Sequence, residues 1–251
     1  MLAAVILAAL LGLVIGSFLG VVGDRLPRRE SIVSPGSHCT SCGRPVRPYD
    51  NIPVLSWLLL RGRCRHCGAA IPRRYPLTEA LTGALFAAVV IVKGADEDAG
   101  IGLVLVALLV PIALIDLEHR IIPNRLLAPA AVLAVVIQSA VDPGALPEHL
   151  IAGVAALIFF GAAALAYPRG MGMGDVKLAG TLGLFLGASV AVAVFVSLLA
   201  GTLIGLAIMA RRGVAAGRKT AVPFGPFLAL GGIVGLLAGP PLVQAYLDTF
   251  T

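Results

Sequence analysis

Asp116 and Asp175 are the residues of this sequence best suited to chemistry, because each lies at the edge of a long apolar stretch. A carboxylate at the edge of a bilayer is costly, and such residues are usually kept for a function. Two carboxyl groups that share one proton can activate a water molecule. The sequence therefore predicts a hydrolytic pair built from two segments that lie far apart along the chain.

Each aspartate also has an ordinary structural interpretation. Asp175 could be the N-cap of a helix, a position that favours aspartate. Asp116 could form an interfacial ion pair with His119 or Arg120. However, both aspartates are expected at the same depth, beside the glycine-rich loop Gly170–Gly174, whose backbone could admit an extended peptide. This coincidence favours catalysis.

The composition predicts that membrane-spanning helices position these carboxyl groups. Of the 251 residues, 59% are hydrophobic and 13% are charged, whereas about a quarter of the residues of soluble domains are charged. Most of the uncharged stretches come near the about 20 residues that a spanning helix needs. These stretches are 1–23, 80–92, 99–115, 126–141, 150–168, 178–210 and 220–247. Because 178–210 is long and can turn at Gly183 or Gly187, we expect two spans there, and thus an all-α polytopic membrane protein with about eight transmembrane helices.

The placement of charge predicts how the chain is oriented. Ten arginines lie between Arg25 and Arg74, and in the eight-span arrangement only the basic residue Lys93 lies on the opposite side. The other basic residues on the arginine-rich side are Arg120, Arg125, Arg169, Lys177, Arg211, Arg212, Arg218 and Lys219. The positive-inside rule puts this side in the cytoplasm and both termini outside. The net charge of +6 then reflects contact with anionic lipid rather than with nucleic acid.

All four cysteines lie in the one long polar segment, as Cys39-x2-Cys42 and Cys64-x2-Cys67. Two such pairs, each followed by glycine, predict a tetrahedral structural zinc site, because each short turn presents two thiolates to one ion. Four thiolates leave no open coordination position, so the metal would organise a segment that is too small to fold well alone. The alternative is two disulfides, which a cytoplasmic location disfavours.

The sequence thus predicts three parts: a first transmembrane helix at 1–23, a cytoplasmic zinc insert at 24–76 and a transmembrane core at 77–251. The first stretch lacks a basic n-region and a clear cleavage site, so we expect a retained helix rather than a signal peptide. His38 and His66 flank the cysteines and are expected to lie outside the ligand set. The arginines of the insert predict a surface that faces lipid headgroups, and a phosphate or adenosine-ligand site is the alternative.

Short motifs along nearly the whole chain resemble one family. These motifs are Gly16-Ser17-Phe18-Leu19, Arg25-Leu26-Pro27, Ser37-His38-Cys39, Asp50-Asn51-Ile52-Pro53, Arg61-Gly62-Arg63-Cys64, Arg74-Tyr75-Pro76, Gly172-x-Gly174-Asp175-x-Lys177 and Pro223-Phe224-Gly225-Pro226-Phe227. The chain resembles the bacterial type IV prepilin peptidases, which are intramembrane aspartic proteases of the GxGD class. The protease motif together with the four-cysteine insert is far more specific than the protease motif alone.

The resemblance implies a membrane endopeptidase that removes the short basic leader from prepilins and pseudopilins at the cytoplasmic face of the bacterial inner membrane. Asp116 and Asp175 become the catalytic pair. It also implies methylation of the new N-terminus with S-adenosylmethionine as the methyl donor. The chain departs from the family pattern at Gly20 and Asp50, where asparagine and glutamate are usual. Both lie in or near the part linked with methylation, so a peptidase without methyl transfer is an alternative.

Two interpretations come from other functional classes. A proton-coupled transporter could use the two carboxylates as a relay, but it would be expected to have internal repeats and midplane carboxylates, and the sequence has neither. A zinc-stapled scaffold for a pilus or secretion machine is the second. The cluster Pro223–Phe227 predicts a kink at the start of the last span, with lining of the substrate path as a second role. Nothing in the sequence indicates an oligomeric state.

Overall fold

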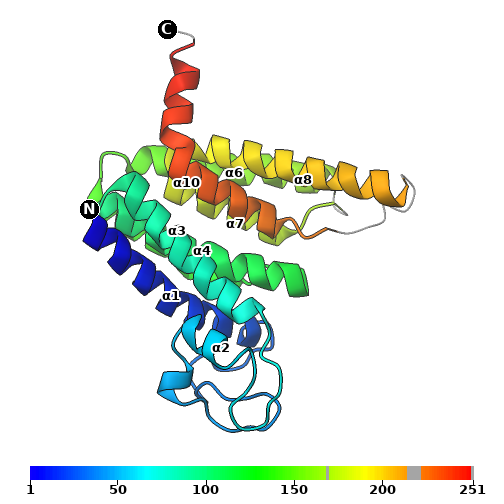
Figure 1. The fold of residues 1–251 in the computed structure, drawn as a ribbon. Helices are drawn as coiled ribbons and strands as arrows, with labels where there is room; N and C mark the ends of the chain where they lie inside the picture. Colours follow the sequence, from blue (N-terminus) through cyan, green and yellow to red (C-terminus); the bar gives the residue numbers. More distant parts are fainter. Residues whose placement is uncertain (168–169, 214–221, 250–251) are drawn as a thin grey trace. The chain divides into compact units, whose positions relative to one another are not determined.

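The computed structural model describes residues 1–167, 170–213 and 222–249, and all its long secondary-structure elements are helices, whereas most of 26–73 is turn and loop. In chain order its elements are α1 (Leu2–Arg25), η1 (Pro48–Asp50), α2 (Leu55–Leu59), α3 (Arg74–Lys93), α4 (Glu97–His119), α5 (Asn124–Val141), α6 (Leu146–Ala166), α7 (Met173–Leu186), η2 (Gly187–Ser189), α8 (Val190–Arg212) and α10 (Gly225–Leu247) (Figure 1). The predicted all-α fold is confirmed. Three of the basic residues used to predict the orientation, Arg169, Arg218 and Lys219, lie outside the described residues.

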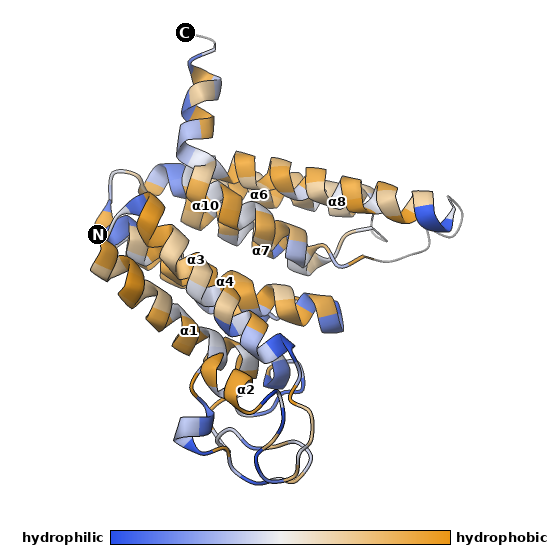
Figure 2. Cartoon of the chain, in the orientation of Figure 1, coloured by the Kyte–Doolittle hydropathy of each residue, from blue (hydrophilic) through white to orange (hydrophobic). Residues whose placement is uncertain are grey.

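The predicted multi-pass membrane character is also confirmed. Seven stretches of the described chain are long and apolar enough to cross a membrane, when Met173–Arg212 is counted as one. Hydrophobic residues dominate the long helices, whereas the segment between α1 and α3 is largely hydrophilic (Figure 2). Within Met173–Arg212, the turn η2 separates α7 from α8 and the chain reverses its direction (Figure 1). The break falls at Gly187, where φ is +54°, one of the two glycines at which a turn was predicted.

The helices form two compact units, Met1–Pro111 and Ile112–Thr251, and the division falls inside α4. In the N-terminal unit, α1 packs along α3 through glycines. A Cβ atom on Gly12 would lie 2.7 Å from the carbonyl oxygen of Thr82, and one on Gly16 would lie 2.8 Å from Cα of Glu79. Small residues at this spacing let two spanning helices approach at the level of their backbones. The three parts predicted from the sequence, 1–23, 24–76 and 77–251, stay a prediction.

The C-terminal unit uses the same kind of contact between α6 and α7. A Cβ atom on Gly183 would lie 2.6 Å from the carbonyl oxygen of Ala152, and one on Gly153 would lie 2.8 Å from a methyl group of Leu184. Such close approach fixes the position of α7 along α6, because any shift would bring side chains into the contact. Since α7 carries Asp175 in its first turn, this packing also fixes the height of one of the two predicted catalytic carboxyl groups.

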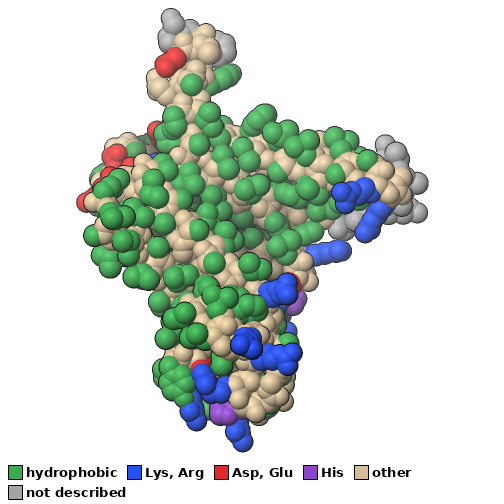
Figure 3. Space-filling model, viewed as in Figure 1, with side chains coloured by type: hydrophobic (Ala, Val, Ile, Leu, Met, Phe, Trp, Pro, Cys, Tyr) green, Lys and Arg blue, Asp and Glu red, His purple; other side chains and the backbone are tan. Residues whose placement is uncertain are grey.

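The polar segment 26–73 buries only Ser56 and Gly62, so side-chain packing contributes little to its fold. Polar contacts attach it to the ends of α1 and α3. Nη1 of Arg25, in α1, donates to the carbonyl oxygen of Pro35 at 2.7 Å, and the backbone N–H of Val54 donates to the carboxylate of Glu79, in α3, at 2.7 Å. The two helix ends are themselves joined by a salt bridge of 2.6 Å between Asp24 and Arg74. Lys and Arg side chains gather over this segment (Figure 3), as the sequence predicts for a surface facing anionic headgroups.

Candidate active site and metal centre

The two predicted catalytic aspartates lie in the same unit, at the ends of different helices. Asp116 lies three residues before the end of α4 at His119, and the residue is buried with 5% of its surface exposed. Asp175 is the third residue of α7 and is half-buried. Each carboxyl group therefore lies at the end of an apolar helix, as the sequence predicts.

The partner of Asp116 comes from a third helix. The backbone N–H of Gly225, the first residue of α10, donates to Oδ2 of Asp116 at 2.8 Å, across 109 residues of sequence. A helix N-terminus favours a negative charge at this place. Within the described residues no salt bridge of 4.0 Å or less joins Asp116 to His119 or Arg120, so the structure gives the alternative interpretation of Asp116 no direct contact. Nε2 of His119 lies 4.0 Å from Oε2 of Glu118.

Asp175 lies at the start of its own helix, but it is not the N-cap. The N-cap is Gly172, which has an extended backbone, and the backbone N–H of Gly172 donates to Oδ2 of Asp175 at 3.2 Å. The interpretation of Asp175 as the N-cap is therefore wrong, because the N-cap lies three residues earlier. The carboxylate of Asp175 still lies at the positive end of the α7 dipole, so the electrostatic argument for an aspartate in this turn holds. Both predicted catalytic carboxylates thus accept a hydrogen bond from a backbone N–H at a helix start.

Contacts between neighbouring residues bring the Asp116 and Asp175 segments together. A Cβ atom on Gly174 would lie 2.9 Å from Cβ of Ile122, so only glycine allows α7 to start this close to the segment after α4. Lys177 Nζ donates to Oδ1 of Asn124 at 3.1 Å. Two carboxyl groups that lie close together can hold one proton between them and polarise a water molecule.

Sequence reasoning missed the role of Gly225 and assigned its surroundings wrongly. The predicted kink at Pro223–Phe227 is absent, because α10 begins at Gly225 and places Pro226 in its first turn, where no backbone N–H is needed. Phe224 instead packs on Phe160 and Phe227, with ring centroids 6.0 Å apart in both pairs. The feature of the sequence that could have revealed this role is a glycine between two prolines at the start of an apolar stretch. Such a glycine indicates that its backbone approaches another group closely, but the sequence does not identify that group.

The four cysteines form one cluster. The sulfur atoms of Cys39, Cys42, Cys64 and Cys67 all lie within 4.8 Å of one another, and the Sγ atoms of Cys39 and Cys67 are 3.7 Å apart. Tetrahedral zinc with Zn–S bonds of about 2.3 Å requires sulfur atoms about 3.8 Å apart. The four cysteines could therefore bind a metal ion, and their spacing fits zinc.

The two cysteine pairs have the same backbone geometry. In the first, Gly43 has φ of +69° and donates its N–H to the carbonyl of Cys39 at 2.8 Å; in the second, Gly68 has φ of +71° and donates to Cys64 at 3.0 Å. Positive φ at these positions is what glycine permits and other residues resist. The predicted role of the glycine after each pair, to turn the backbone behind the ligands, is thus confirmed.

The electrostatics of the cluster also fit a bound cation. The backbone N–H groups of Cys42 and Ser41 lower the pKa of the Cys39 thiol to about 6. The N–H of Ala69 acts in the same direction on Cys67, but desolvation and the three neighbouring thiols outweigh it and raise the pKa of Cys67 to about 11. Four thiolates this close repel one another, and a dication would allow all four to ionise.

The flanking histidines have other partners. Nδ1 of His38 lies 3.0 Å from the carbonyl oxygen of Gly36, and Nδ1 of His66 lies 3.2 Å from Nη1 of Arg44. Neither belongs to the group of possible ligands in the described residues.

Two family models match the chain. The Bacterial Peptidase A24 N-terminal domain matches residues 10–93, and the Type IV leader peptidase family matches residues 103–208. The first match covers the cysteine cluster and the second covers Asp116 and Asp175, so the two candidate sites fall in different matched regions.

Curated relatives match over nearly the full length of the chain. A prepilin leader peptidase/N-methyltransferase of Pseudomonas aeruginosa is 34% identical over 98% of this chain and 94% of its own length. Proteins of the same name are similar in Bacillus subtilis, with 35% identity over 94% of this chain and 95% of the relative, and in Aeromonas hydrophila, with 34% identity over 97% and 94%. No solved structure matches. These findings favour the hydrolytic interpretation over the transporter and the scaffold.

Proposed function

The chain belongs to the type IV prepilin leader peptidase/N-methyltransferase family, and we propose that it removes the leader from prepilins and pseudopilins with Asp116 and Asp175. The observation that carries this proposal is that both carboxyl groups lie in one unit and accept a backbone N–H from a helix start. The close approach of Gly174 to Ile122 and the hydrogen bond from Lys177 to Asn124 bring the two segments together, which supports a shared site.

The proposed mechanism uses the two carboxyl groups in opposite protonation states. The ionised carboxylate takes a proton from a water molecule, and its protonated partner donates a hydrogen bond to the scissile carbonyl oxygen. The water oxygen then forms the new C–O bond, and the leaving amine takes up a proton as the C–N bond breaks. Because the two groups interact, the proton on the free enzyme belongs to the pair rather than to one residue.

The proposed orientation puts this site and the cysteine insert on the cytoplasmic side, with both termini outside. The support is the basic residues along the insert and at the end of α8, because positively charged segments stay in the cytoplasm. A substrate would then keep its basic leader in the cytoplasm and its apolar stretch in the bilayer, so the scissile bond would fall at the membrane surface.

The metal centre has a structural role in this proposal. Zinc held by Cys39, Cys42, Cys64 and Cys67 would have no open position for a substrate, so it would hold the insert together. We also propose that the enzyme methylates the new N-terminus, an activity that the names of the relatives include. S-adenosylmethionine would supply the methyl group: the amine nitrogen forms a C–N bond, the C–S bond breaks with its electrons left on sulfur, and the amine proton goes to water.

The test is cleavage of a prepilin peptide by the purified full-length protein, followed by mass spectrometry. We expect Asp116→Asn or Asp175→Asn to lower the cleavage rate by more than about 10³-fold, because an amide can neither take up nor release the proton. Glu118→Gln is the matched control, since it makes the same chemical change two residues from Asp116 on an exposed side chain.

If either asparagine variant cleaves the leader at the wild-type rate, Asp116 and Asp175 are not the catalytic pair. With S-adenosylmethionine present, the mature product should gain the mass of one methyl group. A product that is cleaved but never methylated would leave the enzyme a peptidase only.

A further inference from the structure

The polar segment 26–73 contains one short apolar helix, α2, whose leucines face outward. Leu55, Leu58 and Leu59 are 49%, 58% and 73% exposed, and their spacing puts them on one face of the helix. Figure 2 shows α2 as an apolar element within this largely hydrophilic segment. An exposed apolar patch marks a contact with protein or with lipid. The depth of α2 along the spanning helices decides between these two.

The start of α2 is bound to a buried carboxylate of the spanning helix α3. The backbone N–H of Val54, directly before α2, donates to Oε2 of Glu79 at 2.7 Å, and Glu79 is only 8% exposed. Glu79 lies five residues after the start of α3 at Arg74, which is about 8 Å along the helix axis. A buried carboxylate at this depth needs a partner, and the backbone of Val54 provides it.

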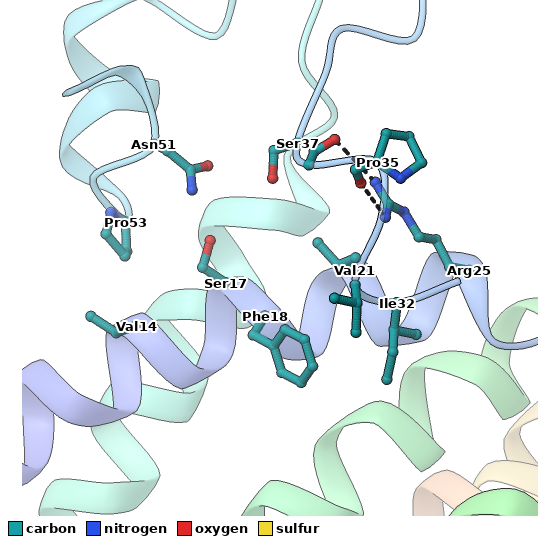
Figure 4. A pocket seen from close by; sticks show the side chains of 12 residues that line it. Val14, Ser17, Phe18, Val21, Arg25, Ile32, Pro35, Ser37, Asn51 and Pro53 are labelled. Atoms are coloured by element: carbon teal, nitrogen blue, oxygen red, sulfur yellow. Dashed lines mark hydrogen bonds between the residues drawn. The ribbon is translucent and has the colours of Figure 1, made fainter. Parts of the chain in front are cut away.

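The segment before α2 reaches a similar depth along α1. Pro53 lines a cavity beside α1 together with Ser17 (Figure 4). Ser17 lies eight residues before the end of α1 at Arg25, or about 12 Å along the axis. A Cβ atom on Gly16 would lie 2.8 Å from Cα of Glu79, so both depths refer to one level. Because a hydrocarbon core of about 30 Å covers most of two spanning helices, this level lies inside it.

The backbone of this segment is suited to a place without water, where irregular backbone must be hydrogen-bonded or buried. The N–H of Ile52 donates to Oγ of Ser56 at 3.1 Å, and the same Oγ donates to the carbonyl oxygen of Tyr49 at 2.8 Å. Val54 has φ of +61°, a conformation that β-branched residues rarely adopt. Its bond to Glu79 holds it there.

Cationic side chains lie on both sides of the apolar segment. Arg61 and Arg63 follow α2 directly, and Arg73 and Arg74 lie at the start of α3. Long arginine side chains can extend from an apolar segment to the headgroups, and their charge complements anionic lipid. This arrangement favours a lipid surface as the partner of α2.

Trp57 connects α2 to the rest of the insert. Its Nε1–H donates to the carbonyl oxygen of Ile71 at 3.1 Å. A Cβ atom on Gly62 would lie 2.8 Å from the indole ring, so the ring packs on the backbone of Gly62. The position of α2 therefore depends on the folded insert, and it should be lost when the insert unfolds.

We propose that α2 enters the hydrocarbon of the leaflet on the insert side, with Leu55, Leu58 and Leu59 against acyl chains and the flanking arginines at the headgroups. Lipid is the expected occupant because Leu77 and Leu81 of α3, on either side of Glu79 in sequence, are also exposed. The insert is then held to the membrane by an apolar segment of its own. The proposal depends neither on leader cleavage nor on methyl transfer.

Trp57 allows a direct test, because it is the one tryptophan of the sequence. The test measures its fluorescence in the zinc-loaded, full-length protein, in phosphatidylcholine–phosphatidylglycerol vesicles whose acyl chains carry bromine near the glycerol end. Bromine quenches indole fluorescence at short range. We expect a loss of at least about twofold relative to unbrominated vesicles, since tryptophan at the membrane boundary reaches the acyl chains. Iodide in the water should quench it little.

The double substitution Leu58→Glu and Leu59→Glu tests the leucine face. We expect it to abolish quenching by bromine and to raise quenching by iodide at least about twofold, because carboxylates are costly in hydrocarbon. Leu58→Met with Leu59→Met is the matched control, since it keeps the face apolar, and it should be quenched like the wild-type protein. If the glutamate variant loses zinc, its fold is disturbed, and the wild-type measurement then decides.

Three results would overturn the proposal. Quenching of the wild-type protein by iodide but not by bromine would place Trp57 in water. Quenching by neither would mean that protein covers α2, for example a second copy of the chain. Quenching by bromine that persists in a zinc-loaded glutamate variant would mean that the leucines do not hold α2 in the membrane.

Discussion

The two units of the molecule pack their helices in the same way but hold their polar groups differently. In Met1–Pro111, Gly12 and Gly16 bring α1 against α3; in Ile112–Thr251, Gly153 and Gly183 bring α6 against α7. The N-terminal unit keeps its chemistry in an insert outside the helices, where thiols and ion pairs hold the chain. The C-terminal unit places its carboxylates at the starts and ends of the helices themselves.

This difference indicates what each site depends on. The carboxylate site needs only correct helix packing, because backbone N–H groups at the helix starts orient it. The insert cannot rely on packing, since only Ser56 and Gly62 are buried in 26–73, so it depends on its metal ligands and on contacts with the ends of α1 and α3. Substitutions that remove the metal ligands of the insert should therefore leave the C-terminal unit largely intact, and substitutions that disturb helix packing around the carboxylates should leave the insert largely intact.

Removing the metal is expected to have the largest effect. Structural zinc sites contribute about 10–16 kcal/mol of apparent binding free energy, more than a segment with almost no buried side chains can replace. We expect the double substitution Cys39→Ser and Cys67→Ser to abolish stoichiometric zinc and to unfold 26–73. Hydrogen exchange should become fast throughout this segment and remain slow in α6 and α7.

Elemental analysis of the purified protein provides the check on metal content. A zinc-free variant that exchanges as slowly as the wild-type protein in 26–73 would show that the insert folds without its metal. The contrast between the two units would then disappear.

Gly225→Ala is expected to have the next largest effect, and in the other unit. The new Cβ atom would lie 2.7 Å from Oδ2 and 3.0 Å from Cγ of Asp116, so the carboxyl group or the start of α10 must move. A misplacement of about 1 Å in a catalytic group can cost about 10²-fold in rate, and we expect a loss of that order in leader cleavage. The zinc content should not change.

Gly205→Ala in α8 is the matched control, because its Cβ atom would meet no atom within 4 Å. Cleavage rates and thermal midpoints of both variants should be measured together. If Gly225→Ala cleaves the leader as fast as Gly205→Ala, the backbone of α10 does not position Asp116.

Local patterns in the sequence predicted much of the fold but not the tertiary contacts of the sites. The apolar stretches and the Cys-x2-Cys pairs carry their signal within about 20 residues, and the helices and the sulfur cluster followed from them. The bond from Gly225 to Asp116 spans 109 residues, and it depends on where α10 packs, which no local pattern specifies. The sequence did not predict the cavity beside α1 for the same reason, since the segments that line it come together only in the folded protein.

The smallest effect is expected from the ion pair of Asp50 and Arg65 in the insert. Arg65 donates to both carboxylate oxygens of Asp50, at 2.9 Å and 2.6 Å, and its guanidinium lies 5.6 Å from the centre of the Tyr49 ring. Ion pairs near the surface contribute little to stability. We therefore expect Asp50→Asn to lower the thermal midpoint of the zinc-loaded protein only slightly, far less than loss of the metal does.

The pH dependence follows from the pKa of Asp50, which its hydrogen bond and charge contact with Arg65 hold below the usual value. A carboxyl group with a lowered pKa stabilises the folded state above its unfolded-state pKa of about 3.9, and this contribution is lost as the pH falls through the lower folded-state value. Between about pH 6 and about pH 8 the difference between wild type and Asp50→Asn should thus stay constant, while added salt should reduce it. A difference as large as that caused by metal removal would mean that the ion pair, and not the zinc site, is the main support of the insert.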